Sequence, residues 1–126
     1  MNRTRTRTLA LAVVVALVVV AALGVAAAPA ATRTPVKLVA RVADPFSISL
    51  TKGGKKVTAL KAGAYVIVVK DRAADHDFHI TGPGLGKATS VSGTGTVTWK
   101  VTLRKGVYRY VCDPHASFMK GSFTVK

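Results

Sequence analysis

Residues 106–125 read GVYRYVCDPHASFMKGSFTV, and this stretch decides how the chain can fold. Large aromatic side chains alternate with Val107, Arg109 and Val111 before the only cysteine, a period of two that is typical of a β-strand with one face in a core. Tyr108, Tyr110 and Cys112 then share the inner face, so the cysteine continues a row of buried aromatics. The stretch predicts a strand, a short loop that carries several possible metal ligands, and a last strand over 121–125.

The rest of the chain beyond residue 36 has the same short period. Turn residues interrupt the apolar runs at intervals of about eight to twelve positions, which is typical of an all-β sandwich or barrel. No convincing helix is found, and residues 82–86 (Gly-Pro-Gly-Leu-Gly) are interpreted as a long, stiff loop. The predicted fold is an all-β Greek-key β-sandwich of about seven or eight strands. The predicted strands are Val36–Val42, Phe46–Thr51, Tyr65–Lys70, Asp77–Thr81, Thr96–Leu103, Gly106–Val111 and Gly121–Val125.

The loop after the Tyr-rich strand carries three possible metal ligands. Cys112, His115 and Met119 offer a thiolate, an imidazole and a thioether within eight residues. Two histidines and one cysteine in a trigonal arrangement, with a weak axial methionine, form the site of blue-copper electron-transfer proteins. The second histidine must therefore come from elsewhere in the chain.

Strand alternation selects His76 as that second histidine. In the predicted strand over 77–81, Phe78 and Ile80 should face the core, and His76 has the same parity. Asp77 and His79 have the opposite parity, and His79 is expected to be solvated. The predicted site is one type 1 copper ion held by His76, Cys112, His115 and Met119.

Each candidate ligand also has an ordinary structural explanation. Cys112 could be a small buried hydrophobe and Met119 core filler, while His115 could be a surface loop histidine. Zinc also binds His and Cys, but a thioether is a poor zinc ligand and structural zinc sites usually use more than one cysteine. Four protein ligands leave no open position for a substrate, so an enzyme is not expected. A copper-binding or copper-delivery protein of the cell envelope with the same ligands remains an alternative.

The segments Tyr108–His115 and Met119–Gly121 resemble the closing strand, ligand loop and last strand of the cupredoxins. The plastocyanin, pseudoazurin and amicyanin type is most similar, and the resemblance covers about residues 46–126. It implies a blue-copper electron carrier in which His76, Cys112 and the exposed His115 are ligands and Met119 is the axial thioether. It also implies that Tyr108, after Gly106, pins a Greek-key crossover.

Two features depart from the cupredoxin pattern. Asp77 stands where the family has an asparagine that ties the two ligand-bearing segments together, and an ionised carboxylate can only accept hydrogen bonds. Three residues separate His115 from Met119, one fewer than in plastocyanins and one more than in amicyanins. The electron is expected to leave through His115, inside an apolar docking ring. The predicted ring comprises Pro83, Leu85, Pro114 and Phe118.

The first thirty residues have the composition of a targeting segment. Three arginines precede residue 9, residues 9–31 are uncharged, and Ala28-Pro29-Ala30 resembles a signal-peptidase site. We predict a signal peptide over 1–30, a linker over 31–36 and the copper domain over 37–126. An uncleaved membrane anchor is the alternative, since more than eighteen apolar residues can span a bilayer. Either reading predicts export to the periplasm, the cell envelope or the outside.

The domain is strongly basic. The net charge of +14 becomes +11 once the three leader arginines are set aside. Such a charge favours anionic partners. An exported chain with dispersed basic residues is not expected to bind nucleic acid, so we expect an acidic redox protein partner and consider an anionic membrane or wall surface possible. The protein is expected to be a monomer.

Overall fold

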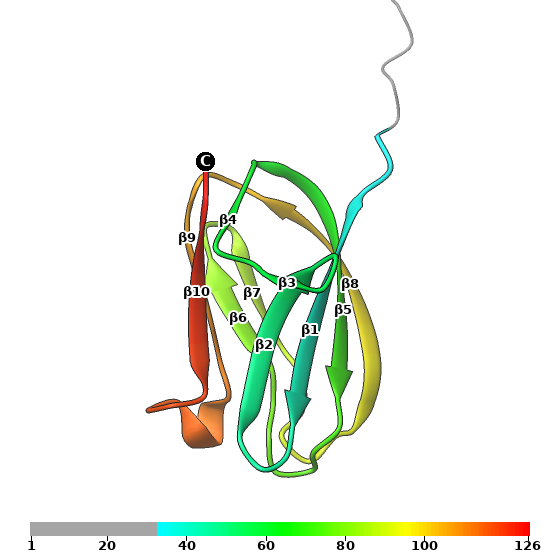
Figure 1. The fold of residues 1–126 in the computed structure, drawn as a ribbon, viewed down its shortest axis with the longest axis vertical. Coiled ribbons are helices and arrows are strands. Elements are labelled where there is room, and N and C mark those ends of the chain that lie inside the picture. The colour runs from blue at the N-terminus through cyan, green and yellow to red at the C-terminus, as the bar shows by residue number, and fades with distance from the viewer. Residues whose placement is uncertain (1–32) are drawn as a thin grey trace, which may run out of the picture. The chain divides into compact units, whose positions relative to one another are not determined.

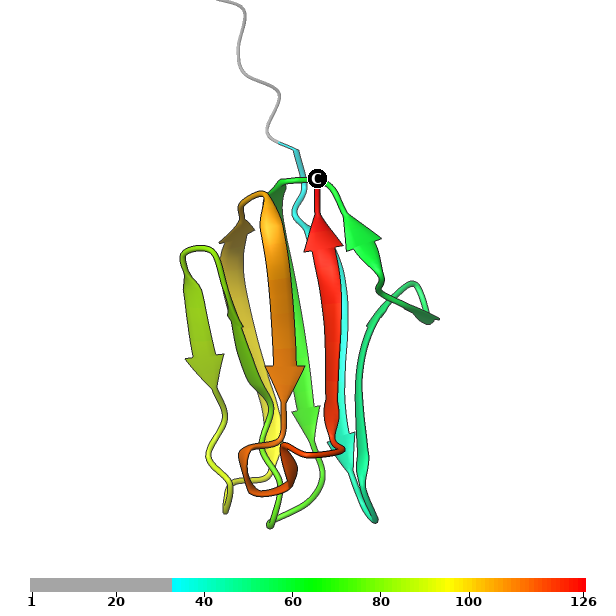
Figure 2. The ribbon, with the colours of Figure 1, turned by 90° about the vertical axis from the view of Figure 1, so that its left-hand side faces the viewer.

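The computed structural model describes residues 33–126. The predicted signal peptide over 1–30, its alternative as an anchor, and the start of the predicted linker lie outside the described residues. The described part forms two five-stranded sheets that pack face to face (Figures 1 and 2). The strands are β1 (Val36–Ala43), β2 (Ser47–Lys52), β3 (Lys55–Lys56), β4 (Ala59–Leu60), β5 (Gly63–Asp71), β6 (His79–Gly82), β7 (Leu85–Ala88), β8 (Gly95–Leu103), β9 (Gly106–Val111) and β10 (Lys120–Val125).

The first sheet has the strand order β3-β2-β1-β5-β8. Strands β1 and β5 are parallel, whereas β1 with β2 and β5 with β8 are antiparallel. Buried side chains alternate along β5, where Tyr65, Ile67 and Val69 face the core. This alternation is the period of two that the sequence displays, because successive side chains of a strand point to opposite faces.

The second sheet has the order β4-β10-β9-β6-β7 and is built around the Tyr-rich strand β9. The predicted inner row is confirmed, since Tyr108, Tyr110 and Cys112 are all buried. The predicted stiff loop over 82–86 is wrong: Gly82 and Leu85 close a β6–β7 hairpin. The expected seven or eight strands become ten within the described residues. The additional strands β3, β4 and β7 have two to four residues, too few to display a period.

A tyrosine corner fixes the crossover between the sheets. The Tyr108 hydroxyl accepts a hydrogen bond from the Arg104 backbone N–H and donates one to the Pro83 carbonyl, both at 2.9 Å. Gly106 turns the chain with φ of 139°, and a Cβ there would lie 2.6 Å from the Pro83 ring. The predicted role of Gly106 and Tyr108 is therefore confirmed.

The sandwich has two chemically different ends. Strands β1, β5 and β9 all run toward one of them, which we call the loop end and which holds residues 44–46, 72–78 and 112–119. The other, the corner end, holds the tyrosine corner, the turns at 61–62, 83–84 and 104–105, and Lys126. Figure 2 shows the loop end at the bottom, with the turn formed by the 3₁₀ helix Asp113–His115. Among residues 33–126, no helix has the length and hydropathy needed to cross a bilayer.

Candidate metal centre

Two loops of the loop end bring three metal-binding atoms together. The Nδ1 atoms of His76 and His115 lie 3.0 Å apart, and Cys112 Sγ lies 3.6 Å from the first and 3.5 Å from the second. A point equidistant from the three atoms lies about 2.0 Å from each, close to the bond length from zinc to an imidazole nitrogen. The donor set therefore fits a first-row transition metal.

His76 is buried and its ring is held from behind. Its Nε2 lies 3.1 Å from the carbonyl oxygen of Pro45. Because a carbonyl only accepts, Nε2 donates to it, and Nδ1 faces Cys112 and His115. The carboxylates of Asp44 and Asp75 lie 3.7 and 3.8 Å from the same Nε2. The ring is thus oriented for metal binding through Nδ1.

Strand alternation predicted the burial of His76 correctly but for an incomplete reason. Strand β6 begins only at His79, so residues 76–78 precede it and do not alternate as a strand. Phe78 and Ile80 face the core as predicted, but Asp77 is buried as well, contrary to the prediction. The parity rule fails at Asp77 because it applies only to residues with strand geometry.

Cys112 directly follows β9 and is fully buried. Burial raises the pKa of its thiol, while backbone hydrogen bonds from Asp77 and His115 act in the opposite direction. A thiolate at this position therefore requires a compensating cation, and a coordinating thiol is deprotonated by its metal.

Met119 is buried and tied by its backbone to the other loop residues. Its N–H donates to the His115 carbonyl at 2.9 Å, and its carbonyl accepts from the Cys112 N–H at 2.9 Å. The His115 N–H in turn donates to the Cys112 carbonyl at 3.0 Å. These three bonds hold the residues that carry the thiol, the imidazole and the thioether in one closed turn.

His115 is the least buried of the predicted ligands, and two exposed aromatic rings lie beside it. Phe46 is 56% exposed, with its ring centroid 5.1 Å from that of His115; Phe118 is 57% exposed and 5.6 Å away. Phe46 was predicted to begin a strand, and its position beside His115 was not predicted, because nothing in its local pattern points to a loop about 70 residues away. Pro83 and Leu85 were wrongly predicted in the docking ring. They lie in the β6–β7 hairpin turn at the corner end.

A polar network links the two ligand-bearing loops. The Asp113 backbone N–H donates to Asp77 Oδ1 at 2.6 Å, so the carboxylate provides the tie that the family makes with asparagine. Burial raises the pKa of Asp77, and the charge of Asp113 adds to this. His79 is not simply solvated, as expected, since its Nδ1 lies 3.0 Å from Asp113 Oδ1. It lies outside the group of three metal-binding atoms.

Two packed β-sheets with a His-Cys-His group at one end define a cupredoxin. Residues 42–126 match the family model described as copper-binding proteins of the plastocyanin/azurin family. The chain belongs to this family, and its cofactor is a single type 1 copper ion.

Solved structures of rusticyanin show a similar fold. Reduced rusticyanin at 1.9 Å is 21% identical, with a TM-score of 0.52 over 71% of this chain and 78% of that chain. The structure of reduced rusticyanin determined by NMR is 23% identical, with a TM-score of 0.51 over 71% and 76% of the two chains. A search of curated proteins found no match. At these identities the likeness to rusticyanin establishes the fold alone.

Proposed function

We propose that the protein is an exported electron carrier that cycles one copper ion between Cu(II) and Cu(I). Its ligands are His76, Cys112, His115 and Met119. The observation that carries the proposal is the convergence of two imidazole Nδ1 atoms and a buried thiol within 3.6 Å of one another. Such a trigonal set with a long thioether is used for electron transfer.

The surroundings of the ligands suit a site that changes little between oxidation states. His76 is held by the Pro45 carbonyl, and Cys112, His115 and Met119 are held by one another's backbones. When copper is bound, it supplies the one-electron redox couple. The protein fixes the ligand positions in advance, so little rearrangement accompanies a change of charge.

The electron should enter and leave through His115. The other three ligands are buried, whereas the His115 ring is partly exposed beside Phe46 and Phe118. We propose that a redox partner docks on these two exposed phenylalanines. Short-lived redox complexes bury small interfaces, and aromatic side chains contribute strongly to interface energetics.

The charge of the redox partner remains a prediction. The net charge of the domain predicts an acidic partner. The described structure adds that Asp44, Asp75 and Asp113 are exposed at the loop end. Electrostatic attraction of an acidic partner close to His115 is therefore weaker than the net charge implies.

The proposal is tested by the visible spectrum of the copper-loaded, oxidised protein. We expect an intense thiolate-to-copper absorption band that is absent from the Cys112→Ser variant. Far-UV circular dichroism verifies that the variant still folds. A colourless Cu(II) protein, or a band that survives the substitution, would exclude a blue-copper carrier.

A copper-delivery protein with the same ligands is distinguished by copper retention. A carrier keeps its metal in both oxidation states and exchanges electrons rapidly, whereas a delivery protein releases copper. Copper retained by the oxidised and the reduced protein in the presence of a Cu(I) chelator supports the carrier. Loss of copper on reduction supports delivery.

A further inference from the structure

Charge is distributed unequally between the two ends of the sandwich. All five aspartates of the chain lie at or beside the loop end: Asp44, Asp75, Asp77 and Asp113 in its loops, and Asp71 as the last residue of β5. No aspartate or glutamate side chain of the described residues lies at the corner end. The corner end and the adjoining β2–β3 hairpin instead carry eight exposed basic side chains. They are Arg33, Lys52, Lys55, Lys56, Lys61, Arg104, Lys105 and Lys126.

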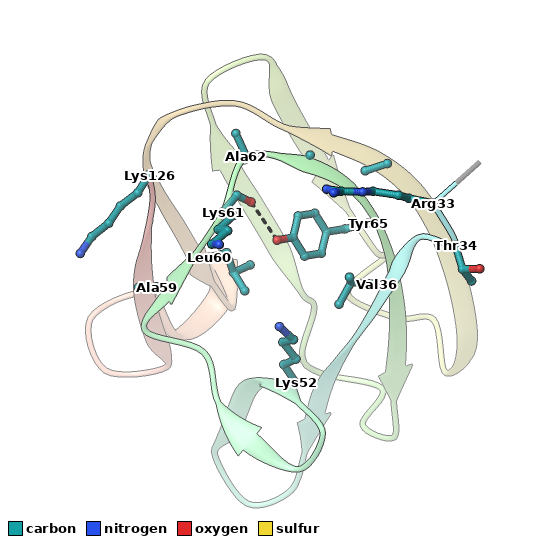
Figure 3. A pocket seen from close by; sticks show the side chains of 12 residues that line it. Arg33, Thr34, Val36, Lys52, Ala59, Leu60, Lys61, Ala62, Tyr65 and Lys126 are labelled. Atoms are coloured by element: carbon teal, nitrogen blue, oxygen red, sulfur yellow. Dashed lines mark hydrogen bonds between the residues drawn. The ribbon is translucent and has the colours of Figure 1, made fainter. Parts of the chain in front are cut away.

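Four of these basic side chains surround a pocket of about 550 Å³ at the corner end. Figure 3 shows Arg33 and Lys52 directed toward the pocket centre, with Lys126 extending outward. Tyr65 lies in the middle, and its hydroxyl donates to the Lys61 carbonyl at 2.8 Å. Apolar side chains such as Leu60 and Val36 complete the lining. The pocket therefore has an apolar floor and a cationic rim.

The basic side chains are not neutralised within the domain. Among residues 33–126, every ion pair within 4.0 Å involves a histidine, and no lysine or arginine pairs with an aspartate. Eight such cations at one end repel one another and destabilise the folded domain, and an anionic partner would relieve this repulsion. The position of the charges thus points to a binding surface opposite the copper ligands.

The covalent order of the chain indicates what kind of anionic partner meets this surface. Arg33, on the rim of the pocket, follows only two positions after the uncharged run over residues 9–31. In the alternative in which residues 9–31 stay in the membrane as an anchor, Arg33 lies next to the headgroups, where each basic side chain gains about 1 kcal/mol from anionic lipids. A flat anionic surface also suits cations that are spread over several turns.

We propose that the corner end docks on an anionic phospholipid bilayer and that the loop end then faces away from the lipid. Headgroup phosphates would neutralise the cationic rim, and the pocket floor would cover part of a headgroup. Docking in this orientation leaves His115, Phe46 and Phe118 free to meet a redox partner. This inference concerns residues remote from the metal and does not depend on copper.

The test compares binding of the full chain to two kinds of vesicle, phosphatidylcholine alone and phosphatidylcholine with 30% phosphatidylglycerol. The ratio of the two partition coefficients isolates the electrostatic contribution, because residues 9–31 are apolar and act on both vesicles. The corner variant carries Lys52→Gln, Lys61→Gln and Lys126→Gln. The matched control carries Lys87→Gln, Lys100→Gln and Lys120→Gln, three exposed lysines away from the corner end.

Each lysine near an anionic surface strengthens binding about five-fold, so the corner variant should lose about 100-fold in this ratio. The control should lose much less. Equal losses would mean that net charge alone acts, and no loss in the corner variant would mean that these lysines serve another partner, such as an acidic protein; either result overturns the proposal. Far-UV circular dichroism verifies the fold of both variants whether or not they bind copper.

Hydrogen exchange supplies the orientation. Anionic vesicles should slow exchange of backbone amides in residues 59–65 and 104–106 of the full chain, and leave residues 113–118 unchanged. Protection of residues 113–118 instead would place the loop end on the lipid and contradict the proposal.

Discussion

The loop end and the corner end lie at opposite ends of the same strands, yet they use polar groups in different ways. At the corner end, one tyrosine hydroxyl makes two hydrogen bonds to backbone groups, and its role is structural. At the loop end, two imidazole rings and a thiol converge, and their lone pairs face one another. Facing lone pairs require a cation or a proton between them. The functional end is therefore distinguished by polar atoms that face one another, more than by how deeply its side chains are buried.

The largest expected effect separates two histidines of the loop end. His76→Ala should abolish the blue copper site, because it removes one of the three converging atoms. The matched variant His79→Ala should keep the absorption band, because His79 contacts Asp113 and not the metal-binding group. Copper titration followed by visible absorption measures both. A band lost in the His79 variant and kept in the His76 variant would reverse the assignment.

A substitution at the corner end should change the stability of the domain and leave the copper absorption spectrum unchanged. Tyr108→Phe leaves the Arg104 N–H and the Pro83 carbonyl without their shared partner, which should lower the free energy of unfolding by about 1–3 kcal/mol. Urea unfolding of the metal-free protein measures it. Tyr65→Phe, which removes one hydrogen bond, is the control and should cost less. A Tyr108 variant that changes the copper spectrum would show that the two ends are coupled.

The axial position tests whether Met119 belongs to the functional group or only to the core. Met119→Leu should keep a coloured copper site and raise its reduction potential, because a weak electron donor to Cu(II) is replaced by hydrocarbon. Redox titration measures the potential. An unchanged potential would make Met119 core filler.

The buried carboxylate of Asp77 gives a smaller, pH-dependent effect. Its raised pKa means that the native state holds this proton more tightly than the unfolded state does. The protonated Asp77 side chain therefore makes its full favourable contribution to the free energy of unfolding below the unfolded-state pKa of about 3.9. This contribution declines as the pH rises through the pKa of Asp77 in the native state. Asp77→Asn keeps an acceptor for the Asp113 N–H and has no charge. The metal-free variant should be more stable than the wild type at pH 7, and this difference should shrink below about pH 4; thermal unfolding at both pH values measures it.

The smallest expected effect concerns salt. Because the exposed Asp44, Asp75 and Asp113 offset the positive charge of the domain near His115, electron transfer between His115 and small redox reagents should depend only weakly on ionic strength. The Debye length shortens from about 30 Å at 0.01 M to about 8 Å at 0.15 M salt. Strong electrostatic steering would therefore be seen as a fall in rate over this range. Stopped-flow rates with anionic and cationic reagents of equal driving force measure it. A strong preference for the anionic reagent would favour the acidic partner predicted from net charge.

The sequence predicted most of this arrangement because its signals were local. Alternation in β9 predicted the buried row through Tyr108 and Cys112, and the loop spacing predicted the metal-binding group. The missing parts depend on contacts between distant segments. Phe46 reaches His115 only through the sandwich topology. The separation of charge between the ends likewise depends on strand direction, which a charge count does not contain.

The closed turn formed by Cys112, His115 and Met119 has a consequence for how the protein can vary. Three backbone hydrogen bonds complete it, and the hydrogen bond from the Asp113 N–H to Asp77 ties it to the loop that carries the first histidine. The length of the turn can therefore change while the two sheets stay the same. A chain with one residue more or fewer between His115 and Met119 could keep its sheets and its first histidine unchanged, and adjust only how closely the thioether approaches the metal. The number of residues in this loop would then set the reduction potential of the copper site without changing the fold.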